Sequence, residues 1–232
     1  MRILVTICAR KGSKRVKNKN MRDLMGKPLI IHTIETAKKW GRADRIVVST
    51  DSEEIAAVSR EYGADVPFMR PKELASDTAP KLPVIRHVVE FLMDEENEEF
   101  DLVVDLDPTS PLRTVEDIEN AYNTVLNRNC VNLFSVCSAR KSPYFNMVEL
   151  DDKGYAHLSK TLKNPIFRMQ DTPIVYELNA SIYMYWTKYL FDMKSVINEG
   201  SIIYEMPYER SIDIDSEMDF NMVEFFIKNN KL

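Results

Sequence analysis

The chain has 232 residues, which suits one large domain that buries about 70% of its unfolded surface and needs no disulfide or structural metal. Its formal net charge of −5 argues against general binding to nucleic acid or to a membrane surface, and no apolar stretch approaches the ~20 residues that would span a bilayer. The three cysteines form no metal-binding pair, and the first residues read as a strand rather than a signal peptide, so we expect a cytoplasmic protein.

Strands and helices are predicted to alternate over the first 140 residues. Each predicted strand is a nearly continuous apolar run of the kind that is buried on both faces: 2–9, 45–50, 101–107 and 131–139. Each predicted helix has apolar residues at helical spacing: 27–40, 51–63, 82–93 and 114–126. Their start signals are Pro28, Asp51 or Ser52, and Thr114. This alternation predicts a doubly wound α/β fold with a mostly parallel sheet and helices on both faces.

The pattern changes at about residue 141. Residues 141–178 begin with a predicted hairpin that turns at 152–154 and continue as an irregular stretch, so we interpret them as an inserted arm. Two further strands are expected at 180–186 and 201–207, followed by a closing helix. The core face of that helix is predicted to hold Met218, Met222, Phe225 and Phe226. The α/β domain then comprises residues 1–140 and 179–232.

A basic loop, residues 9–20 (ARKGSKRVKNKN), follows the first predicted strand. It carries six Lys or Arg residues in an otherwise acidic chain. Ligands of parallel α/β folds bind beyond the carboxyl ends of the strands, where this loop would lie. Its charges, with Gly12 and Ser13, suit a polyphosphate, although neither the P-loop nor the dinucleotide fingerprint is present. A solvated surface loop is the alternative interpretation.

Two aspartate pairs have the spacing of metal ligands on a strand. In SIDIDSEMD, a strand would place Asp213 and Asp215 on one side, ~7 Å apart, where both could bind one Mg²⁺ ion. The alternative is a half-exposed strand with its polar residues outward. Asp105 and Asp107 share this spacing at the end of a strand, and Arg113 is either a clamp for ligand charge or a partner for nearby acids.

The loop FMRPKELASDTAP precedes the third predicted helix. Arg70, Ser76, Asp77 and Thr78 cluster there, and a helix cap formed by Ser76 or Asp77 is the simplest interpretation. The three histidines are isolated in the sequence, and no nucleophile motif is present, which argues against histidine-based metal or covalent chemistry.

Six segments occur in the order and spacing typical of one family: ARKGSKRVKNKN, RIVVSTDSEEIA, RPKELASDTA, PTSPLR, NASIY and SIDIDSEMDF. Together they resemble the acylneuraminate cytidylyltransferases, the CMP-sialic acid synthetases and their relatives, over nearly the whole chain. The resemblance implies a doubly wound α/β domain with a protruding dimerisation arm, and hence a homodimer. It also implies Mg²⁺-dependent transfer of CMP from CTP to a nine-carbon 2-keto sugar acid, with release of pyrophosphate.

The resemblance further implies roles for individual residues. The catalytic residues would be Arg10, Lys19, Asp213 and Asp215, the last two holding Mg²⁺. The nucleotide would be bound by Ala9, Arg10, Gly12, Ser13, Lys19, Asn20, Arg70, Ala75 and Ser76. The sugar would be bound by Asp107, Arg168, Gln170, Asn179 and Tyr183. Arg168 and Gln170 come from the arm, so they could serve either their own site or that of a partner subunit.

Two departures from the sialic acid members fall on the sugar side. Asp107 stands where many members have Gln, and residues 177–180 read Glu-Leu-Asn-Ala where many have Arg-Pro-Asn-Gly. Both segments look more like the branch that acts on di-N-acetylated sugars such as legionaminic acid. Two other functions stay open for aspartate pairs on an α/β fold: a metal-dependent glycosyltransferase that uses a nucleotide-sugar donor, and a nucleotide-binding module without turnover.

Overall fold

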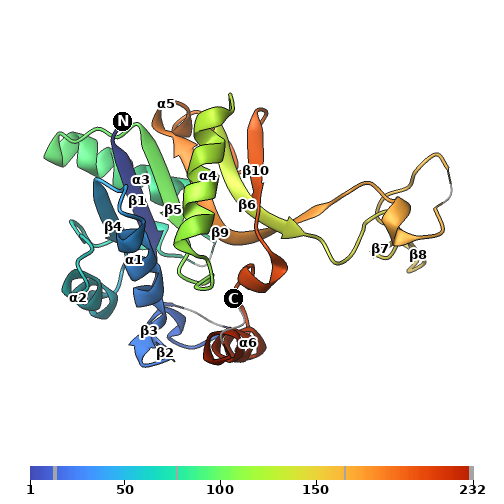
Figure 1. The fold of residues 1–232 in the computed structure, drawn as a ribbon, viewed down its shortest axis with the longest axis horizontal. Coiled ribbons are helices and arrows are strands. Elements are labelled where there is room, and N and C mark those ends of the chain that lie inside the picture. The colour runs from blue at the N-terminus through green and yellow to red at the C-terminus, as the bar shows by residue number, and fades with distance from the viewer. Residues whose placement is uncertain (13–14, 77, 165, 230–232) are drawn as a thin grey trace.

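A six-stranded sheet forms the centre of the protein (Figure 1). The computed structural model describes residues 1–12, 15–76, 78–164 and 166–229. The strands lie in the order β10-β6-β9-β5-β1-β4, and all neighbours are parallel except β9, which runs antiparallel to both β5 and β6. Their bounds are Ile3–Cys8 (β1), Arg45–Ser49 (β4), Leu102–Leu106 (β5), Asn132–Ser138 (β6), Tyr176–Trp186 (β9) and Ser201–Glu205 (β10). The predicted mostly parallel sheet is therefore confirmed.

Helices cover both faces of this sheet. One buried cluster joins Ile7 of β1 to α1, α2 and α4, and a second joins Leu4 of the same strand to α3 and α5. The helices are α1 (Leu29–Trp40), α2 (Glu53–Glu61), α3 (Lys81–Glu96), α4 (Val115–Asn127), α5 (Thr187–Leu190) and α6 (Glu217–Lys228). Within the described residues, none of these helices is both long and apolar enough to cross a membrane.

The helix starts follow local capping chemistry. The Ser52 hydroxyl accepts a hydrogen bond from the Ile55 amide, and Thr114 forms a reciprocal capping box with Asp117, so both predicted caps are confirmed. The expected Ser76 cap of α3 is wrong, because the helix begins at Lys81 after Pro80 and has no side-chain cap. Asp77, the other expected cap, lies outside the described residues.

A third buried cluster closes the carboxyl-terminal side of the sheet. It joins α6 to a small hairpin of β2 (Asp23–Leu24) and β3 (Lys27–Pro28). The expected core face of α6 is partly wrong, because Met218 is 71% exposed and Phe225 is 51% exposed. Phe220 and Val223 are the buried residues of α6 instead, because the face of the helix that carries them packs against the third cluster.

The segment before α6 corrects a second expectation. Ser211–Asp215 is not a strand, although Ile212 and Ile214 still point inward and are buried. The Ile214 amide donates to the Thr109 carbonyl at 2.9 Å, which ties the segment to the loop after β5. That loop is not a strand, so no regular ladder can form, and the segment is held by single contacts.

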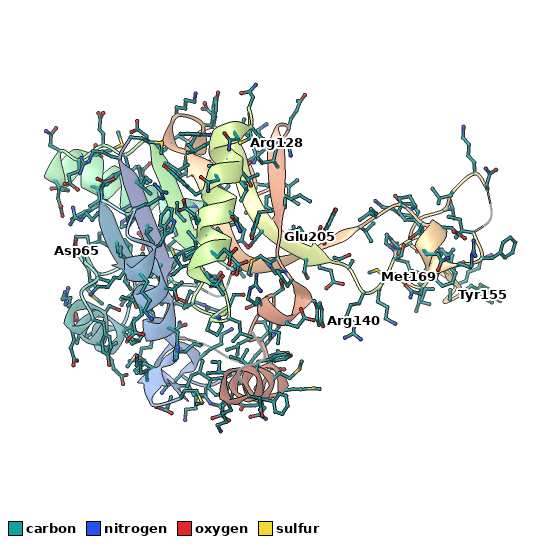
Figure 2. All side chains as sticks on the ribbon, in the orientation of Figure 1. Asp65, Arg128, Arg140, Tyr155, Met169 and Glu205 are labelled. Atoms are coloured by element: carbon teal, nitrogen blue, oxygen red, sulfur yellow. The ribbon has the colours of Figure 1, made fainter. Side chains whose placement is uncertain are left out.

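The inserted arm leaves the sheet between β6 and β9 (Figures 1 and 2). Its hairpin consists of β7 (Val148–Leu150) and β8 (Ala156–Leu158), and the predicted turn ends at Gly154, whose φ is +84° and whose amide donates to the Asp151 carbonyl. The stalk of the arm continues the pairing of β6 with β9, so β9 begins at Tyr176 rather than at residue 180.

A bulge interrupts the pairing of β9 with β6. The register shifts between Phe134 and Val136, where Ser135 faces the residues around Asn179. The Ser135 hydroxyl donates to Asn179 Oδ1 at 2.7 Å and accepts from the Ile182 amide at 2.8 Å, so this side chain fills the gap in the ladder. Bulges of this kind often lie beside active sites because they redirect the chain.

Ala180 within this bulge has a φ of 48°, a left-handed conformation that costs an alanine roughly 1 kcal/mol. We expect Ala180→Gly to raise the free energy of unfolding by about 0.5–1 kcal/mol, because glycine adopts this conformation without steric strain. The matched control is Ala37→Gly in the interior of α1, which should lower the free energy of unfolding by about 1 kcal/mol. Urea denaturation of the three proteins measures both; a loss of stability in Ala180→Gly would contradict the strain.

Candidate active site

A cleft of about 520 Å³ opens at the carboxyl ends of β1 and β5. Most of its charged lining is cationic, and two aspartates face these cations. The charged residues are Arg10, Arg15, Lys19, Arg70, Lys81, Asp107 and Asp215. The cleft therefore lies where a doubly wound sheet binds its ligand, and its charges suit an anion together with a cation.

The basic loop is anchored at its two ends. The Ala9 amide donates to the Ser49 carbonyl at 3.0 Å, the Lys11 amide donates to Asp51 Oδ1 at 2.8 Å, and Asn20 Nδ2 donates to the Arg10 carbonyl at 3.1 Å. Buried Ala9 thus belongs to the scaffold and is not among the residues that line the cleft. These contacts hold the loop across the end of the sheet.

Two features of this loop are open to a ligand. A Cβ atom placed on Gly12 would meet nothing within 4 Å, so the backbone there faces free space in the cleft. Asn20 Oδ1 is buried and accepts no hydrogen bond from any described residue. Ser13, a predicted nucleotide-binding residue, lies outside the described residues.

The basic loop and the acidic segment meet directly. Lys19 Nζ donates to the Ile214 carbonyl and lies 3.3 Å from Asp215 Oδ1, while Arg15 Nη1 lies 3.0 Å from Asp215 Oδ2. Arg15 and Asp215 are largely exposed, so their ion pair adds little stability. The contacts instead bring together Lys19 and the acidic segment, 195 residues apart in the chain, which the resemblance assigned to one site.

Asp213 lies deeper than Asp215. Thr109 Oγ1 donates to Asp213 Oδ1 at 2.5 Å, from the loop that follows β5. Burial raises the pKa of the Asp213 carboxyl to about 6; the charges of Asp107 and Asp215 raise it too, whereas the bond from Thr109 and the charge of Lys19 lower it. A cation placed among these carboxylates would offset the repulsion between them.

A further wall of the cleft contains Arg70. Its side chain is 7% exposed, and it donates to the hydroxyl and the carbonyl oxygen of Ser49 at the end of β4. Ser76 lines the cleft next to this wall, whereas Ala75 ends a short helical turn and is not among the cleft-lining residues. Of these three predicted nucleotide-binding residues, Arg70 and Ser76 line the cleft.

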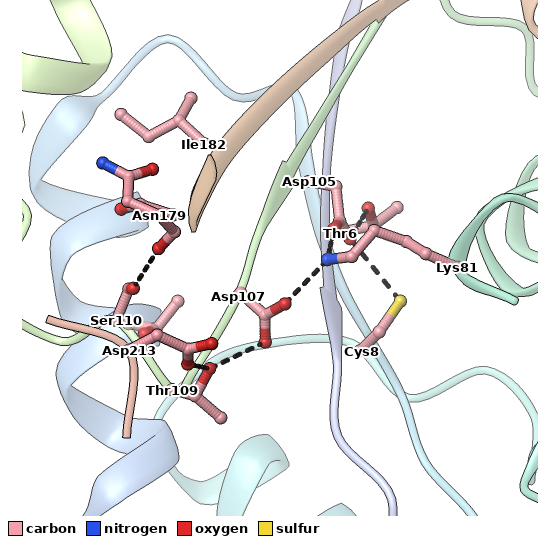
Figure 3. A network of polar contacts seen from close by, with 12 residues as sticks. Thr6, Cys8, Lys81, Asp105, Asp107, Thr109, Ser110, Asn179, Ile182 and Asp213 are labelled. Carbon is pink, nitrogen blue, oxygen red and sulfur yellow. Dashed lines mark hydrogen bonds and ion pairs between the residues drawn. The ribbon is translucent and has the colours of Figure 1, made fainter. Parts of the chain in front are cut away.

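Lys81 is a cleft residue that the sequence interpretation missed (Figure 3). Its ammonium lies 2.8 Å from Asp105 Oδ2 and 2.8 Å from Asp107 Oδ2, and 4.3 Å from the centre of the Tyr183 ring. Burial is the largest influence on its pKa and lowers it, but the two carboxylates prevail, so the pKa of Lys81 is well above its usual value. Lys81 therefore remains a cation. In the sequence, Lys81 directly precedes the predicted helix 82–93, and nothing there indicated its pairing with Asp105 and Asp107.

Of the predicted sugar-binding residues, only Asp107 lines the cleft. Asn179 is 2% exposed, and its amide is bonded to Ser135 and Ser211 within the bulge. Tyr183 is 6% exposed beneath Lys81, and burial raises the pKa of its phenol to about 12. Neither side chain lines the cleft in this structure, and their role beside the sugar stays a prediction.

Arg168 and Gln170 do not join the cleft of their own chain. Both lie on the arm beside Met169, which Figure 2 places well away from the sheet, and Arg168 pairs with Asp171 at 2.9 Å. In this structure both residues therefore lie outside the cleft of their own chain.

Arg113 proves to be structural. The guanidinium is 3% exposed and donates to Ser181 Oγ at 3.0 Å, to Thr33 Oγ1 at 3.2 Å and to the Asp107 carbonyl. Burial lowers the pKa of Arg113 to about 10, which still leaves it charged at neutral pH. It fixes the loop after β5 against β9 and α1 and does not reach a ligand.

The turn before the acidic segment is also anchored, to helix α4. Arg210, in the turn before Ser211, donates twice to Asp117 at 2.8 Å, and the Asp117 carboxylate is 1% exposed. Within the described residues, no group of three or more His, Cys, Asp or Glu side chains could hold a metal by itself. A cation bound by Asp213 and Asp215 would therefore need oxygens from water or from a ligand, which is how Mg²⁺ binds with phosphates.

These features define an α/β protein with a doubly wound sheet, whose cleft combines cations with carboxylates. The chain matches the family described as Cytidylyltransferase over residues 4–225. It is 41% identical to the post-translational flagellin modification protein B of Campylobacter coli and 40% identical to the CMP-N,N'-diacetyllegionaminic acid synthase of Campylobacter jejuni. Each match covers 99% of this chain and 97% of the relative.

The solved structure of CMP:2-keto-3-deoxy-manno-octonic acid synthetase complexed with CTP shares the fold. Its TM-score is 0.73 at 17% identity, and the match covers 99% of this chain and 100% of that one. The chain belongs to the cytidylyltransferase family and is a nucleotidyltransferase. The family match does not support the glycosyltransferase or the binding module without turnover.

The raised pKa of Asp213 makes a prediction about stability. Between pH 3.8 and about 6 the folded carboxyl holds a proton that the unfolded chain releases, so this group lowers stability as the pH rises through that window. Asp213→Asn lacks this loss. We subtract the free energy of unfolding of the wild type from that of Asp213→Asn. We expect this difference to be about 2 kcal/mol larger at pH 7.5 than at pH 3.5. Urea denaturation in EDTA at both pH values measures the difference; an equal difference at the two would contradict the raised pKa.

Proposed function

We propose that the protein transfers CMP from CTP to the anomeric hydroxyl of a nine-carbon 2-keto sugar acid. The hydroxyl oxygen bonds to the α-phosphorus, the bond from that phosphorus to the oxygen bridging the β-phosphate breaks, and pyrophosphate leaves as the hydroxyl proton is lost. One observation carries the proposal: Lys19 and Arg15 of the basic loop meet the Asp213–Asp215 segment at the mouth of the cleft. Phosphoryl transfer depends on positioning and charge neutralisation, which this arrangement supplies.

The basic loop would hold the triphosphate. Arg10 and Lys19 supply positive charge along the cleft, and the open backbone at Gly12 supplies N–H groups for phosphate oxygens. Asn20 Oδ1 is a buried acceptor in need of a donor, which a ribose hydroxyl would satisfy. The wall at Arg70 and Ser76 would then face the cytidine.

Asp213 and Asp215 would hold Mg²⁺ together with phosphate oxygens and water. The fit rests on hard oxygen donors beside a phosphate site and on a carboxyl whose pKa is raised partly by its anionic neighbours. When bound, the ion would neutralise charge on the phosphates as pyrophosphate departs. Lys19 orients the segment that carries both ligands through its bond to the Ile214 carbonyl.

The relatives' names support a di-N-acetylated sugar acid, in particular N,N'-diacetyllegionaminic acid. The C. jejuni relative that bears this name covers the same length as this chain at 40% identity. Asp107 at the cleft wall would accept hydrogen bonds from such an acceptor. We expect a cytoplasmic enzyme, because CTP is a cytoplasmic substrate.

The direct test is pyrophosphate release from CTP with a panel of acids: N,N'-diacetyllegionaminate, pseudaminate, N-acetylneuraminate and the eight-carbon 3-deoxy-manno-octonate. We expect legionaminate to give a kcat/KM at least about tenfold above the others, a difference of about 1.4 kcal/mol in transition-state binding. Release should stop when EDTA replaces Mg²⁺. Preference for N-acetylneuraminate would contradict the proposed sugar, and no release with any acid would contradict the proposed function.

We also propose that the arm binds a second copy of this chain. The arm exposes a run of large apolar side chains that a monomer would leave in water: Val148 (61% exposed), Leu150 (69%), Tyr155 (71%), Phe167 (84%) and Ile174 (76%). Such a surface suits a symmetric dimer, in which each arm would carry Arg168 and Gln170 toward the partner's cleft.

Sedimentation velocity tests this interface. We expect the wild type to sediment as two chains and Phe167→Asp to sediment as one, because a buried unpaired carboxylate would oppose association. Met218→Asp is the matched control, since Met218 is 71% exposed on α6 outside the arm, and this variant should remain a dimer. A monomeric wild type, or a dimeric Phe167→Asp, would contradict the role of the arm.

A further inference from the structure

Lys81, to which the proposed roles assign no task, stands at the centre of a chain of polar contacts (Figure 3). The chain runs from buried Asp105 through the Lys81 ammonium to Asp107, with a distance of 2.8 Å on each side of the ammonium. It continues through the Thr109 hydroxyl to Asp213. The core of the sheet is thus connected to the wall of the cleft through one side chain.

Asp105 is the fixed end of this chain. Its side chain is fully buried, with one oxygen bound by Lys81 and the other accepting from Thr6 Oγ1 at 2.7 Å and from Cys8 Sγ at 3.5 Å. A buried carboxylate is costly unless it is paired, so Asp105 holds the Lys81 ammonium in place. Asp105 cannot reach a ligand itself.

Asp107 is the end that a ligand can reach. Its side chain is 20% exposed at the cleft, and Lys81 occupies Oδ2. Among the described residues, Oδ1 is contacted by Thr109 alone, at 3.4 Å, and the Thr109 hydroxyl makes its shorter bond, 2.5 Å, to Asp213. An ionised carboxylate only accepts hydrogen bonds, so this oxygen selects a ligand that brings an N–H or an O–H group.

We propose that Lys81 is a positioning residue for the sugar acid: anchored by Asp105, it holds the Asp107 carboxylate so that Oδ1 accepts an N–H or O–H group of the acceptor. This inference rests on the proposed function and names how its second substrate is oriented. The same negative oxygen repels a carboxylate, so the acid group of the acceptor must point away from Asp107. The amide and hydroxyl side of the sugar then faces the wall at Lys81.

A double-mutant cycle tests the inference. Lys81→Met alone would leave Asp105 buried without its partner, so the working variant is Lys81→Met with Asp105→Asn, which removes both charges. We expect this variant to raise the KM for the sugar acid about tenfold while the KM for CTP stays within about twofold. Asp107→Asn should give a similar split. The triple variant should be no worse than Asp107→Asn, because Lys81 acts only through Asp107.

Lys27→Met is the matched control, since Lys27 forms an ion pair with Glu35 at 2.6 Å outside the cleft, and both KM values should be unchanged. Additive effects in the cycle, or a KM for CTP that rises as much as the KM for the sugar acid, would overturn the inference while leaving the proposed function intact. A wild type that turns over no sugar acid would overturn both.

Discussion

The contact of Lys19 with the Ile214 carbonyl and with Asp215 is the interaction on which the site depends. It joins the loop after the first strand to the segment before the last helix. Lys19 begins a short 3-10 helix and Ile214 lies in an irregular stretch, so neither segment belongs to a sheet ladder, and individual backbone and side-chain contacts hold them. Arg210 and Asp117 anchor the acidic segment from the other side, and Thr109 holds its centre. The cations and carboxylates therefore face one cleft.

The sheet contributes by fixing the loop that carries Asp107 and Thr109. β9 lies antiparallel between β5 and β6, and its bulge places the Asn179 and Ser181 carbonyls where they accept from Ser110 Oγ and the Asp107 amide. The strain at Ala180 is part of that bulge. Residues 177–180, which read Glu-Leu-Asn-Ala where many sialic acid members have Arg-Pro-Asn-Gly, thus affect the site through backbone conformation as well as through side-chain chemistry.

Local signals in the sequence predicted much of this fold. Apolar runs and caps such as Ser52 and Thr114 depend on residues within one turn, and the structure confirms them. The resemblance also predicted which distant segments meet. Lys81 escaped prediction because its partners are 24 and 26 residues away, and only the folded sheet brings them together. The interior role of Asn179 was hidden for the same reason, since a bulge depends on the register of two strands.

The central claim is that a nucleotide and its metal are held between the basic loop and the acidic segment. Calorimetric titration of CTP, with and without Mg²⁺, into the wild type, Lys19→Met and the double variant Asp213→Asn, Asp215→Asn tests it most directly. The account predicts that Mg²⁺ strengthens CTP binding to the wild type, that the double variant loses this gain, and that Lys19→Met binds CTP weakly in both conditions. Wild-type affinity for CTP in both variants would contradict it.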